Sequence, residues 1–416
     1  GVAFGGLALL SWVLYGIYRA AQRSAYELES LVFLLISIGA AVTAAYDPAS
    51  LYKLLITVVM GMVLFLAMSG VLRDLHLSIR ARWPVAIAAG ALLAFNVVLG
   101  ERIFGAKNWI SIGPLSFQPS ELVKIAFILA GAATLDRLFA KRNLVFTILF
   151  SAYCVGCLAL MSDFGTALIF FVAFLCIAFL RTGDLPSIAM MVAAAAFGCG
   201  IILRFKPYIA DRFAAWRHAW DYAQDIGYQQ TRTMSAMASG GLFGVGPKDG
   251  WLKYVGAANT DLVFGVVGEE FGFLLALCCV AALVIPIVFT LRCAAAARSS
   301  FYTILSCATA AMLVCQMALN VLGAVDLLPL TGVTFPFVSM GGSSMISCWG
   351  LMAYLKAADT RQNASFALRL SKLAPQQREK KAAPAPKARP KAPQEGFFAD
   401  RPDIPVDKIF GKEEDK

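Results

Sequence analysis

The sequence is poor in charge and in histidine. Only 15% of its 416 residues are charged and 59% are hydrophobic, whereas about a quarter of the residues of a soluble domain are charged. The two histidines, His76 and His218, are too few for a histidine-rich metal site. The scarcity of charge and the mean hydropathy of +0.71 together indicate a polytopic membrane protein.

Cysteine is present, but without the spacing of a metal site or a disulfide framework. Almost all of the ten cysteines lie inside apolar runs, and the pair Cys154 and Cys157 has neither a nearby histidine nor a second pair. We interpret the cysteines as small residues that face lipid or the protein core. The net charge of +10 does not indicate nucleic-acid binding, because topology and a basic tail account for much of it.

Long apolar runs predict eleven membrane helices and an all-α, polytopic helical bundle. No small-residue cleavage site follows the first run, so we expect a span there rather than a signal peptide. The expected helices cover approximately residues 3–18, 28–45, 52–72, 84–100, 119–135, 144–161, 164–180, 185–203, 262–291, 301–324 and 337–355.

Basic residues in the short loops predict the orientation of these helices. With the C-terminus inside the cell, the inner loops carry eleven Lys and Arg residues; the outer loops carry Arg102 and Lys107, with Lys53 at a helix edge. An odd number of spans then places Gly1 outside. The inner residues are Arg19, Arg23, Arg73, Arg80, Arg82, Arg137, Lys141, Arg142, Arg181, Arg292 and Arg298.

Two long segments lie outside the predicted spans. The external loop, residues 204–261, holds seven Lys and Arg residues together with Trp216, Tyr222 and Tyr228. A basic loop over a membrane cavity suits an anionic substrate, and headgroup binding is the alternative. In the tail, residues 357–416, the stretch 374–395 is rich in Pro, Ala and Lys and has no apolar period. The tail is predicted to be disordered in the cytoplasm.

Three carboxylates, Asp261, Glu269 and Glu270, lie where the external loop enters an apolar helix. An acidic group at mid-depth in a membrane costs roughly 2.5–3.5 kcal/mol, so such residues are functional candidates. Asp261 should lie roughly 12 Å above Glu269 at about 1.5 Å per residue, and we predict that it is a catalytic base near the membrane surface. The alternative is an ordinary helix-start acid beside Thr260, and Asp163 has the same two interpretations.

Two further pairs of polar residues occur on predicted membrane helices. Glu121 and Lys124 share one face of a helix that begins at Pro119, either as a routine ion pair or as a charged cavity wall. Gln316 and Asn320 are one turn apart, and such pairs more often join helices than bind ligands.

Two glycine-rich stretches punctuate the second half of the chain. The glycines Gly240, Gly241, Gly244 and Gly246 match neither a phosphate-binding loop nor a dinucleotide fingerprint. We interpret them as a re-entrant turn whose backbone approaches a ligand or another helix. The turn 341–344, which opens the last helix, presents amides and hydroxyls to which an anion could bind.

In their order along the chain, these stretches resemble the SEDS family (shape, elongation, division and sporulation), the RodA and FtsW type of peptidoglycan polymerase. The similarity spans about residues 27–356, and the ordered set is specific although each piece is weak. Asp326 stands where the family often has glycine. The matching pieces are Gly105–Ile110, Gln118–Lys124, Asp163–Ala167, Gly227–Gln229, Ser239–Gly246, Thr260–Phe264, Gly268–Gly272, Leu328–Gly332 and Pro336–Ser344.

The resemblance implies a ten-helix core at residues 27–356, with the first span, in residues 1–26, as an extra N-terminal helix. It implies glycosyl transfer on lipid II, with Asp261 matching the essential aspartate of the family. It also implies a partner, a class B penicillin-binding protein that cross-links the strands, within an elongation or division complex. The substrate contacts expected from the motifs are Gln118, Glu121, Lys124, Asp163, Gln229, Thr260, Ser343 and Ser344, and the basic external loop adds Arg212.

The expected chemistry is transfer of a lipid-linked sugar at the outer face of the bacterial plasma membrane. Asp261 would take a proton from the acceptor hydroxyl while polyprenyl pyrophosphate leaves. The charge of the leaving group predicts a divalent cation, magnesium or manganese, or basic side chains such as Lys124, oriented by Glu121, and Arg212. A flippase of the lipid-linked precursor and a scaffold for a transpeptidase are the two alternative functions.

Overall fold

A computed structural model describes residues 1–21, 23, 25–103, 106–112, 115–135, 141–205, 207–295 and 299–358. The predicted tail, apart from its first two residues, lies outside the described residues, as do Gly105 and the predicted inner-loop residues Arg137 and Arg298. All described residues belong to one unit, Gly1–Ser365.

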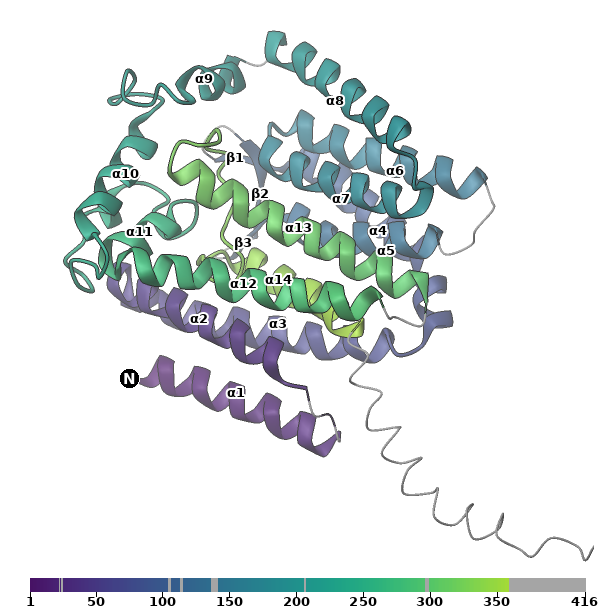
Figure 1. Ribbon diagram of the computed structural model, residues 1–416, viewed down its shortest axis with the longest axis horizontal. Coiled ribbons are helices and arrows are strands. Elements are labelled where there is room, and N and C mark those ends of the chain that lie inside the picture. Colours follow the sequence, from purple (N-terminus) through teal and green to yellow (C-terminus); the bar gives the residue numbers. More distant parts are fainter. Residues whose placement is uncertain are drawn as a thin grey trace, which may run out of the picture. The chain divides into compact units, whose positions relative to one another are not determined.

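Each of the eleven predicted membrane helices is present, and Figure 1 shows them running side by side. Within the part of the chain that the structure describes, seven helices are long and apolar enough to cross a membrane, and two more are shorter apolar helices. Ten of the eleven are continuous: α1 (Val2–Ala20), α2 (Glu27–Tyr46), α3 (Leu51–Val71), α4 (Leu75–Leu99), α5 (Pro119–Leu135), α6 (Lys141–Leu160), α7 (Phe164–Thr182), α8 (Leu185–Phe205), α13 (Ser300–Ala324) and α14 (Gly342–Ala357).

The structure corrects two predicted boundaries. Helix α4 begins nine residues before the predicted position 84, because Asp74 caps it by accepting hydrogen bonds from His76 N (2.8 Å) and Leu77 N (3.2 Å). Pro84 lies inside this helix. Helix α14 begins at Gly342 rather than 337, since residues 337–341 belong to the preceding loop.

The ninth predicted helix is divided into α11 (Val263–Glu270) and α12 (Gly272–Ala295). Gly272 has a φ of +89°, a left-handed conformation that glycine adopts most readily. A Cβ atom at this position would overlap the carbonyl oxygen of Leu242. The helix therefore breaks where the glycine-rich loop packs against it, which a continuous apolar pattern does not reveal.

The segments between the long helices contain secondary structure that was not predicted. The chain from α4 to α5 forms a small antiparallel sheet of β1 (Glu101–Ile103), β2 (Ala106–Ile112) and β3 (Leu115–Phe117), in that order. The external loop contains α9 (Pro207–Ala215) and α10 (Tyr228–Gly240). Figure 1 shows α9, α10 and α11 gathered at one end of the bundle.

Helix α14 is enclosed on all sides by the bundle. It packs against α3, α5 and α13, and nearly all of its residues are buried. The indole of Trp349 lies against Gly61, where a Cβ would collide with it, and it contacts Phe33 and Phe65 edge-on. The absence of a side chain at Gly61 is therefore what admits the largest residue of the core.

A buried ion pair joins α2 to the C-terminal end of α14, and a hydrogen bond from α1 completes it. Lys356 Nζ lies 3.0 Å from Glu29 Oε1 and also donates to the carbonyl oxygen of Ala25 at 2.7 Å. From α1, the Tyr18 hydroxyl donates to the same Glu29 carboxylate. Buried charges are stable only when paired and hydrogen-bonded, so this arrangement joins the N-terminal helix to the centre of the fold.

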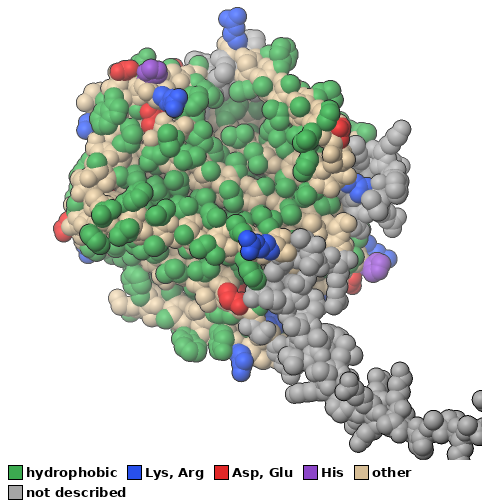
Figure 2. Space-filling view, viewed as in Figure 1, with side chains coloured by type: hydrophobic (Ala, Val, Ile, Leu, Met, Phe, Trp, Pro, Cys, Tyr) green, Lys and Arg blue, Asp and Glu red, His purple; other side chains and the backbone are tan. Residues whose placement is uncertain are grey.

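Hydrogen bonds between loops group the helix ends into two sets. At one end, Lys107 N bonds Met161 O and Gln118 N bonds Ser343 Oγ. At the other, Tyr302 bonds the carbonyl of Leu72 at the end of α3. The two sets agree with the predicted alternation of outer and inner loops. Figure 2 shows a face covered mainly by hydrophobic side chains, with few charged groups on it. The chain is a multi-pass membrane protein.

Candidate functional site

Asp261 lies in the loop between η2 (Leu252–Tyr254) and α11 and is held from several sides. Its backbone N–H donates to Ala257 O at 2.9 Å, and its carbonyl accepts a 2.8 Å hydrogen bond from Asn320 Nδ2 of α13. The carboxylate faces Gly332, where an added Cβ would lie 3.2 Å from Asp261 Oδ2. A glycine at this position therefore leaves room for the carboxylate.

The environment of Asp261 makes its carboxylate more basic than usual. The pKa of Asp261 is raised to about 6, mainly by burial and to a smaller extent by the negative charge of Asp163. A hydrogen bond from Thr260 and the positive charge of Arg212 act in the opposite direction. A carboxylate with a pKa of about 6 is ionised at neutral pH and is well matched to accept a proton there.

Asp163, at the N-terminus of α7, joins three segments of the chain. Its Oδ2 accepts hydrogen bonds from Asn108 of β2 (2.8 Å) and from Gln118 before α5 (2.9 Å), and its Oδ1 accepts one from Thr166 N (3.2 Å). The helix-cap interpretation is therefore correct, and the same carboxylate lies close enough to Asp261 to affect its pKa. Asn108 was not among the predicted site residues.

The loop from Val325 to Gly341 connects the two aspartates. Thr331 packs against Gly165, two residues after Asp163, while Gly332 packs against Asp261. Nearer α14, Ser339 donates to the carbonyl of Thr260 at 2.6 Å. The expected contact residue Thr260 is thus fixed by its backbone, and its single hydroxyl proton lies within reach of both Ala257 O (3.2 Å) and the Asp261 carboxylate.

Lys124 lies at the centre of a buried polar network. Its side chain is fully enclosed (0% exposed) and donates to Glu121 Oε1 at 2.7 Å and to Gln316 Oε1 at 2.9 Å. The predicted pairing with Glu121 is confirmed. Because Lys124 is enclosed, it contacts these protein groups rather than an open cleft.

This network extends from α5 to α13 and α14. Gln316 Nε2 donates to the carbonyl and hydroxyl of Thr334, both at 3.0 Å, and Thr334 Oγ1 lies 2.7 Å from Ser344 Oγ. Ser347 donates to the second oxygen of Glu121 at 3.0 Å. The predicted residues Ser343 and Ser344 are both buried, so in this conformation their hydroxyls serve the protein.

Gln316 and Asn320 do more than join helices. Asn320 Nδ2 donates to Val333 O at 2.7 Å as well as to Asp261 O, and Gln316 bonds Thr334 and Lys124. One turn of α13 therefore bonds to the Asp261 loop, to the 331–334 segment and to the ammonium group of Lys124. The spacing of the two amides predicted a shared face, but the partners became visible only in the structure.

The external loop contributes Arg212 and Gln229 at the rim of the site. Arg212 Nη1 of α9 donates to the carbonyl of Leu330, and its charge acts on Asp261. Gln229 Nε2 of α10 donates to Gly256 O at 3.0 Å, in the loop that leads to Asp261. Of the predicted residues, Arg212 is the basic group that the structure brings to Asp261.

Glu269 and Glu270 belong to the packing of the external loop. Glu269 accepts hydrogen bonds from Trp251 N (2.9 Å) and Leu252 N (3.0 Å), and thereby caps η2. The carboxylate of Glu269 and the Cγ of Glu270 lie against Gly250. Glu269 therefore orders the segment that precedes Asp261.

The described residues do not form a metal site by themselves, since no group of three or more His, Cys, Asp or Glu side chains converges among them. The oxygens of Asp163 are also occupied by protein donors. A divalent cation bound by Asp261 would need most of its ligands from a substrate.

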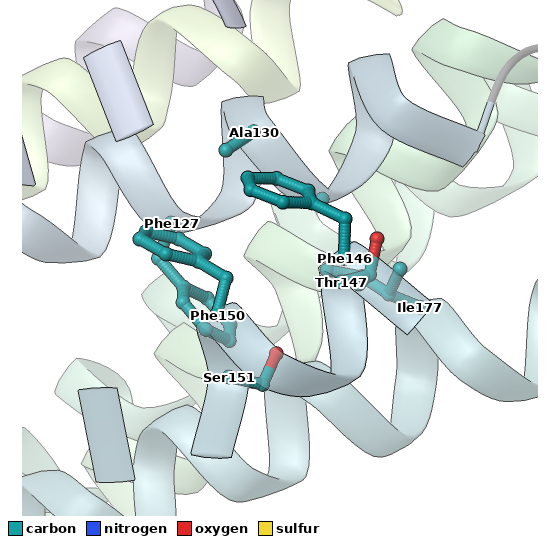
Figure 3. A pocket seen from close by; sticks show the side chains of 8 residues that line it. Phe127, Ala130, Phe146, Thr147, Phe150, Ser151 and Ile177 are labelled. Atoms are coloured by element: carbon teal, nitrogen blue, oxygen red, sulfur yellow. The ribbon is translucent and has the colours of Figure 1, made fainter. Parts of the chain in front are cut away.

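A pocket lined by Phe127, Phe146, Phe150, Ile177 and their neighbours lies between α5, α6 and α7 (Figure 3). The pocket residues that belong to α5 begin at Phe127, 8 residues beyond the start of this helix at Pro119, or roughly 12 Å along the helix. The pocket is mainly apolar and lies away from the end of the bundle that carries Asp261, so we assign it no part in the chemistry.

Comparisons with known proteins identify relatives of this chain. The family model for the FtsW, RodA and SpoVE cell cycle proteins matches residues 21–364. The probable peptidoglycan glycosyltransferase FtsW of Saccharophagus degradans is 28% identical, over 82% of this chain and 93% of the relative. The peptidoglycan glycosyltransferase RodA of Mycobacterium leprae is 29% identical, over 84% and 82%.

Solved structures give the same result for the fold. One, described as structural coordination of polymerization and crosslinking by a peptidoglycan synthase complex, aligns with a TM-score of 0.68 at 26% identity, covering 82% of this chain and 98% of that one. The rod shape determining protein RodA of Thermus thermophilus aligns with a TM-score of 0.61 at 24% identity, over 82% and 97%, which supports the fold alone.

Proposed function

The chain belongs to the FtsW, RodA and SpoVE family of cell cycle proteins, and we propose that Asp261 is the general base of its glycosyl transfer. The protein is a peptidoglycan glycosyltransferase, in common with its relatives of both the FtsW and RodA types. The observation that supports the assignment of Asp261 is its raised pKa of about 6 beside Arg212 and Asp163.

The proposed substrate is lipid II, a disaccharide-peptide on polyprenyl pyrophosphate. The carboxylate of Asp261 takes the proton of the acceptor hydroxyl as its oxygen forms a bond to the anomeric carbon of the donor. The bond from that carbon to the pyrophosphate oxygen breaks, and polyprenyl pyrophosphate leaves with the electron pair. A positioned base of this kind contributes about 10²–10⁴-fold to a rate.

Arg212 is the first candidate to stabilise the leaving group, because its charge already acts at Asp261. Lys124 is enclosed by Glu121 and Gln316. In our proposal it therefore stabilises the buried polar network, and it reaches the substrate only when the loop around Thr334 opens. Magnesium or manganese is proposed only as an ion carried by the pyrophosphate, since Mg²⁺ is commonly bound by one or two carboxylates together with substrate phosphates.

The proposed orientation places Asp261 and the external loop outside the bacterial plasma membrane and the C-terminal tail in the cytoplasm. The loop charges of the sequence support this arrangement. The proposed partner is a class B penicillin-binding protein of the elongation or division machinery, which would cross-link the strands. The solved peptidoglycan synthase complex that couples polymerization to crosslinking supports that pairing.

Polymerisation of lipid II by purified protein in detergent, with and without the transpeptidase, tests the assignment. We expect Asp261→Asn to lower the rate by about 10²–10⁴-fold because it removes a base and keeps the shape. Asp249→Asn, at an exposed carboxylate of the same external loop, is the matched control and should polymerise normally. A folded Asp261→Asn protein with wild-type activity would refute the base, and detergent excludes flipping as the source of product.

A further inference from the structure

The apolar lobe, residues 241–246, lies at the break between α11 and α12. On the α12 side, the carbonyls of Gly241 and Leu242 accept hydrogen bonds from Phe273 N (2.9 Å) and Leu274 N (3.3 Å). On the α11 side, Val245 N donates to Glu269 O at 2.9 Å and Gly246 N to Glu270 O at 3.1 Å. Both interrupted helix ends are thus completed by the same loop.

These hydrogen bonds supply partners to the backbone groups of the helix ends in a low-dielectric environment. The first N–H groups and the last C=O groups of a helix lack partners within the helix, and water normally supplies them. In hydrocarbon no water is available, so irregular backbone is tolerated only when its polar groups are satisfied by protein. Gly244 N also bonds the carbonyl of Gly240, the last residue of α10, at 2.8 Å.

Glycines make this close packing possible. A Cβ at Gly240 or Gly244 would overlap the carbonyl oxygens of Gly268 or Glu270, and Gly244 has a φ of +86°. The lobe is consequently pressed backbone to backbone against the helix break. The side chains of the lobe therefore point away from the protein.

Those side chains are apolar and exposed. Phe243 is 81% exposed and Leu242 57% exposed, and Val245 is exposed as well. The hydrogen bonds to Phe273 and Leu274 place them level with the first turn of α12, whose candidate span begins at Gly272. The exposed faces of Phe273 and Leu274 continue the same apolar surface along the spanning helix.

We propose that the apolar lobe inserts into the lipid bilayer beside the first turn of α12, as a re-entrant anchor for the external loop. Lys248, exposed two residues beyond the lobe, is placed to meet lipid phosphates. The lobe fixes the depth of the following segment, which runs through η2 to Asp261. Lipid is the occupant rather than a protein because the lobe continues a lipid-facing surface, and backbone groups of Gly241, Leu242, Gly244, Val245 and Gly246 already bond within the protein.

Photocrosslinking tests this placement without disturbing the ten cysteines. Benzoylphenylalanine is introduced at position 243, at the lipid-facing Leu277 of α12 (51% exposed) and at the exposed His218 of the external loop. The full chain is reconstituted in nanodiscs of phosphatidylcholine and phosphatidylglycerol, irradiated, and analysed by mass spectrometry for phospholipid adducts. The same three variants are then irradiated in native membranes.

We expect phospholipid adducts at position 243 with a yield similar to that at position 277 and about tenfold above that at position 218, as required of a segment in hydrocarbon. A yield no higher than at 218 overturns the proposal. A lipid adduct in nanodiscs that is replaced by a protein adduct in native membranes also overturns it, and assigns the lobe to a protein partner. Normal lipid II polymerisation by the labelled proteins shows that they are folded.

Discussion

The side-chain amide of Asn320 donates to the carbonyl oxygen of Asp261 at 2.8 Å and to that of Val333 at 2.7 Å. One nitrogen thus joins the loop that carries the proposed base to the loop that packs against its carboxylate. Asn320 is buried in α13, so water cannot replace it.

Substitution of Asn320 by leucine should therefore impair both stability and catalysis. The change leaves two carbonyl oxygens without their donor, at a cost of about 1–3 kcal/mol for each buried group. We expect a lower thermal unfolding midpoint in detergent and a reduced kcat for lipid II polymerisation. The control is Thr309→Val, a buried residue of the same helix whose hydroxyl bonds Leu305 O in its own helix. Equal loss of kcat in both variants would argue against a specific role for Asn320.

The pKa of Asp261 predicts the acid limb of the pH–rate profile. Since the base must be ionised, activity should fall as the pH drops through about 6. Arg212 lowers this pKa and Asp163 raises it, so Arg212→Met should move the limb to higher pH and Asp163→Asn to lower pH. Rates measured from pH 5 to pH 8 check the prediction, and shifts in the same direction would exclude it.

The break between α11 and α12 predicts an unusual sensitivity at Gly272. In Gly272→Ala the left-handed conformation costs about 1–2 kcal/mol, and the new Cβ also overlaps Leu242 O. Gly183 supplies the control, because its φ is +64° and a Cβ there meets nothing within 4 Å. Thermal unfolding in detergent should show a clearly larger loss for Gly272→Ala. Similar losses would mean that the lobe moves aside readily.

The cluster of Tyr18, Glu29 and Lys356 predicts that the N-terminal helix stabilises the bundle. Loss of the hydroxyl in Tyr18→Phe removes a hydrogen bond to a charged group, worth about 1.5–3 kcal/mol. Lys356→Met leaves Glu29 buried without its partner, which should cost about 3–5 kcal/mol. Tyr15→Phe, on the exposed part of α1, is the control for the ring and should unfold at the wild-type temperature.

A double substitution separates charge from packing in this cluster. Glu29→Leu combined with Lys356→Met removes both charges, and a buried pair can often be replaced by apolar residues without loss. We expect the unfolding temperature of the double variant to lie above that of Lys356→Met alone. If it lies below, the pair contributes more than mutual neutralisation.

Periodicity and charge predicted most of the membrane architecture, because long apolar runs and loop charges are local features. The division at Gly272 and the burial of Glu29 with Lys356 depend on segments far apart in the chain. A run of residues cannot show which distant backbone fills the space beside a glycine. Asp326 has a φ of +57°, a left-handed conformation that glycine, the residue expected here from the family resemblance, adopts most readily.

The site was predicted in part. The motifs identified Asp261, Asp163 and Lys124, and the charge of the leaving group suggested Arg212; the structure places Asp163 and Arg212 near Asp261. Of the two interpretations of Lys124, an ion pair or a charged cavity wall, it shows the enclosed ion pair with Glu121, and Gln316 supplies a second partner from another helix. The roles of all the predicted contact residues remain predictions for the substrate-bound enzyme.

The contact of Gly61 with Trp349 has an evolutionary consequence. Since α14 has no free face into which the indole can retreat, a larger residue at position 61 is compatible with the fold only if position 349 becomes smaller at the same time. Homologous sequences should therefore show compensating changes at these two positions. An engineered Gly61→Ala chain should likewise regain its stability through a second-site suppressor at Trp349.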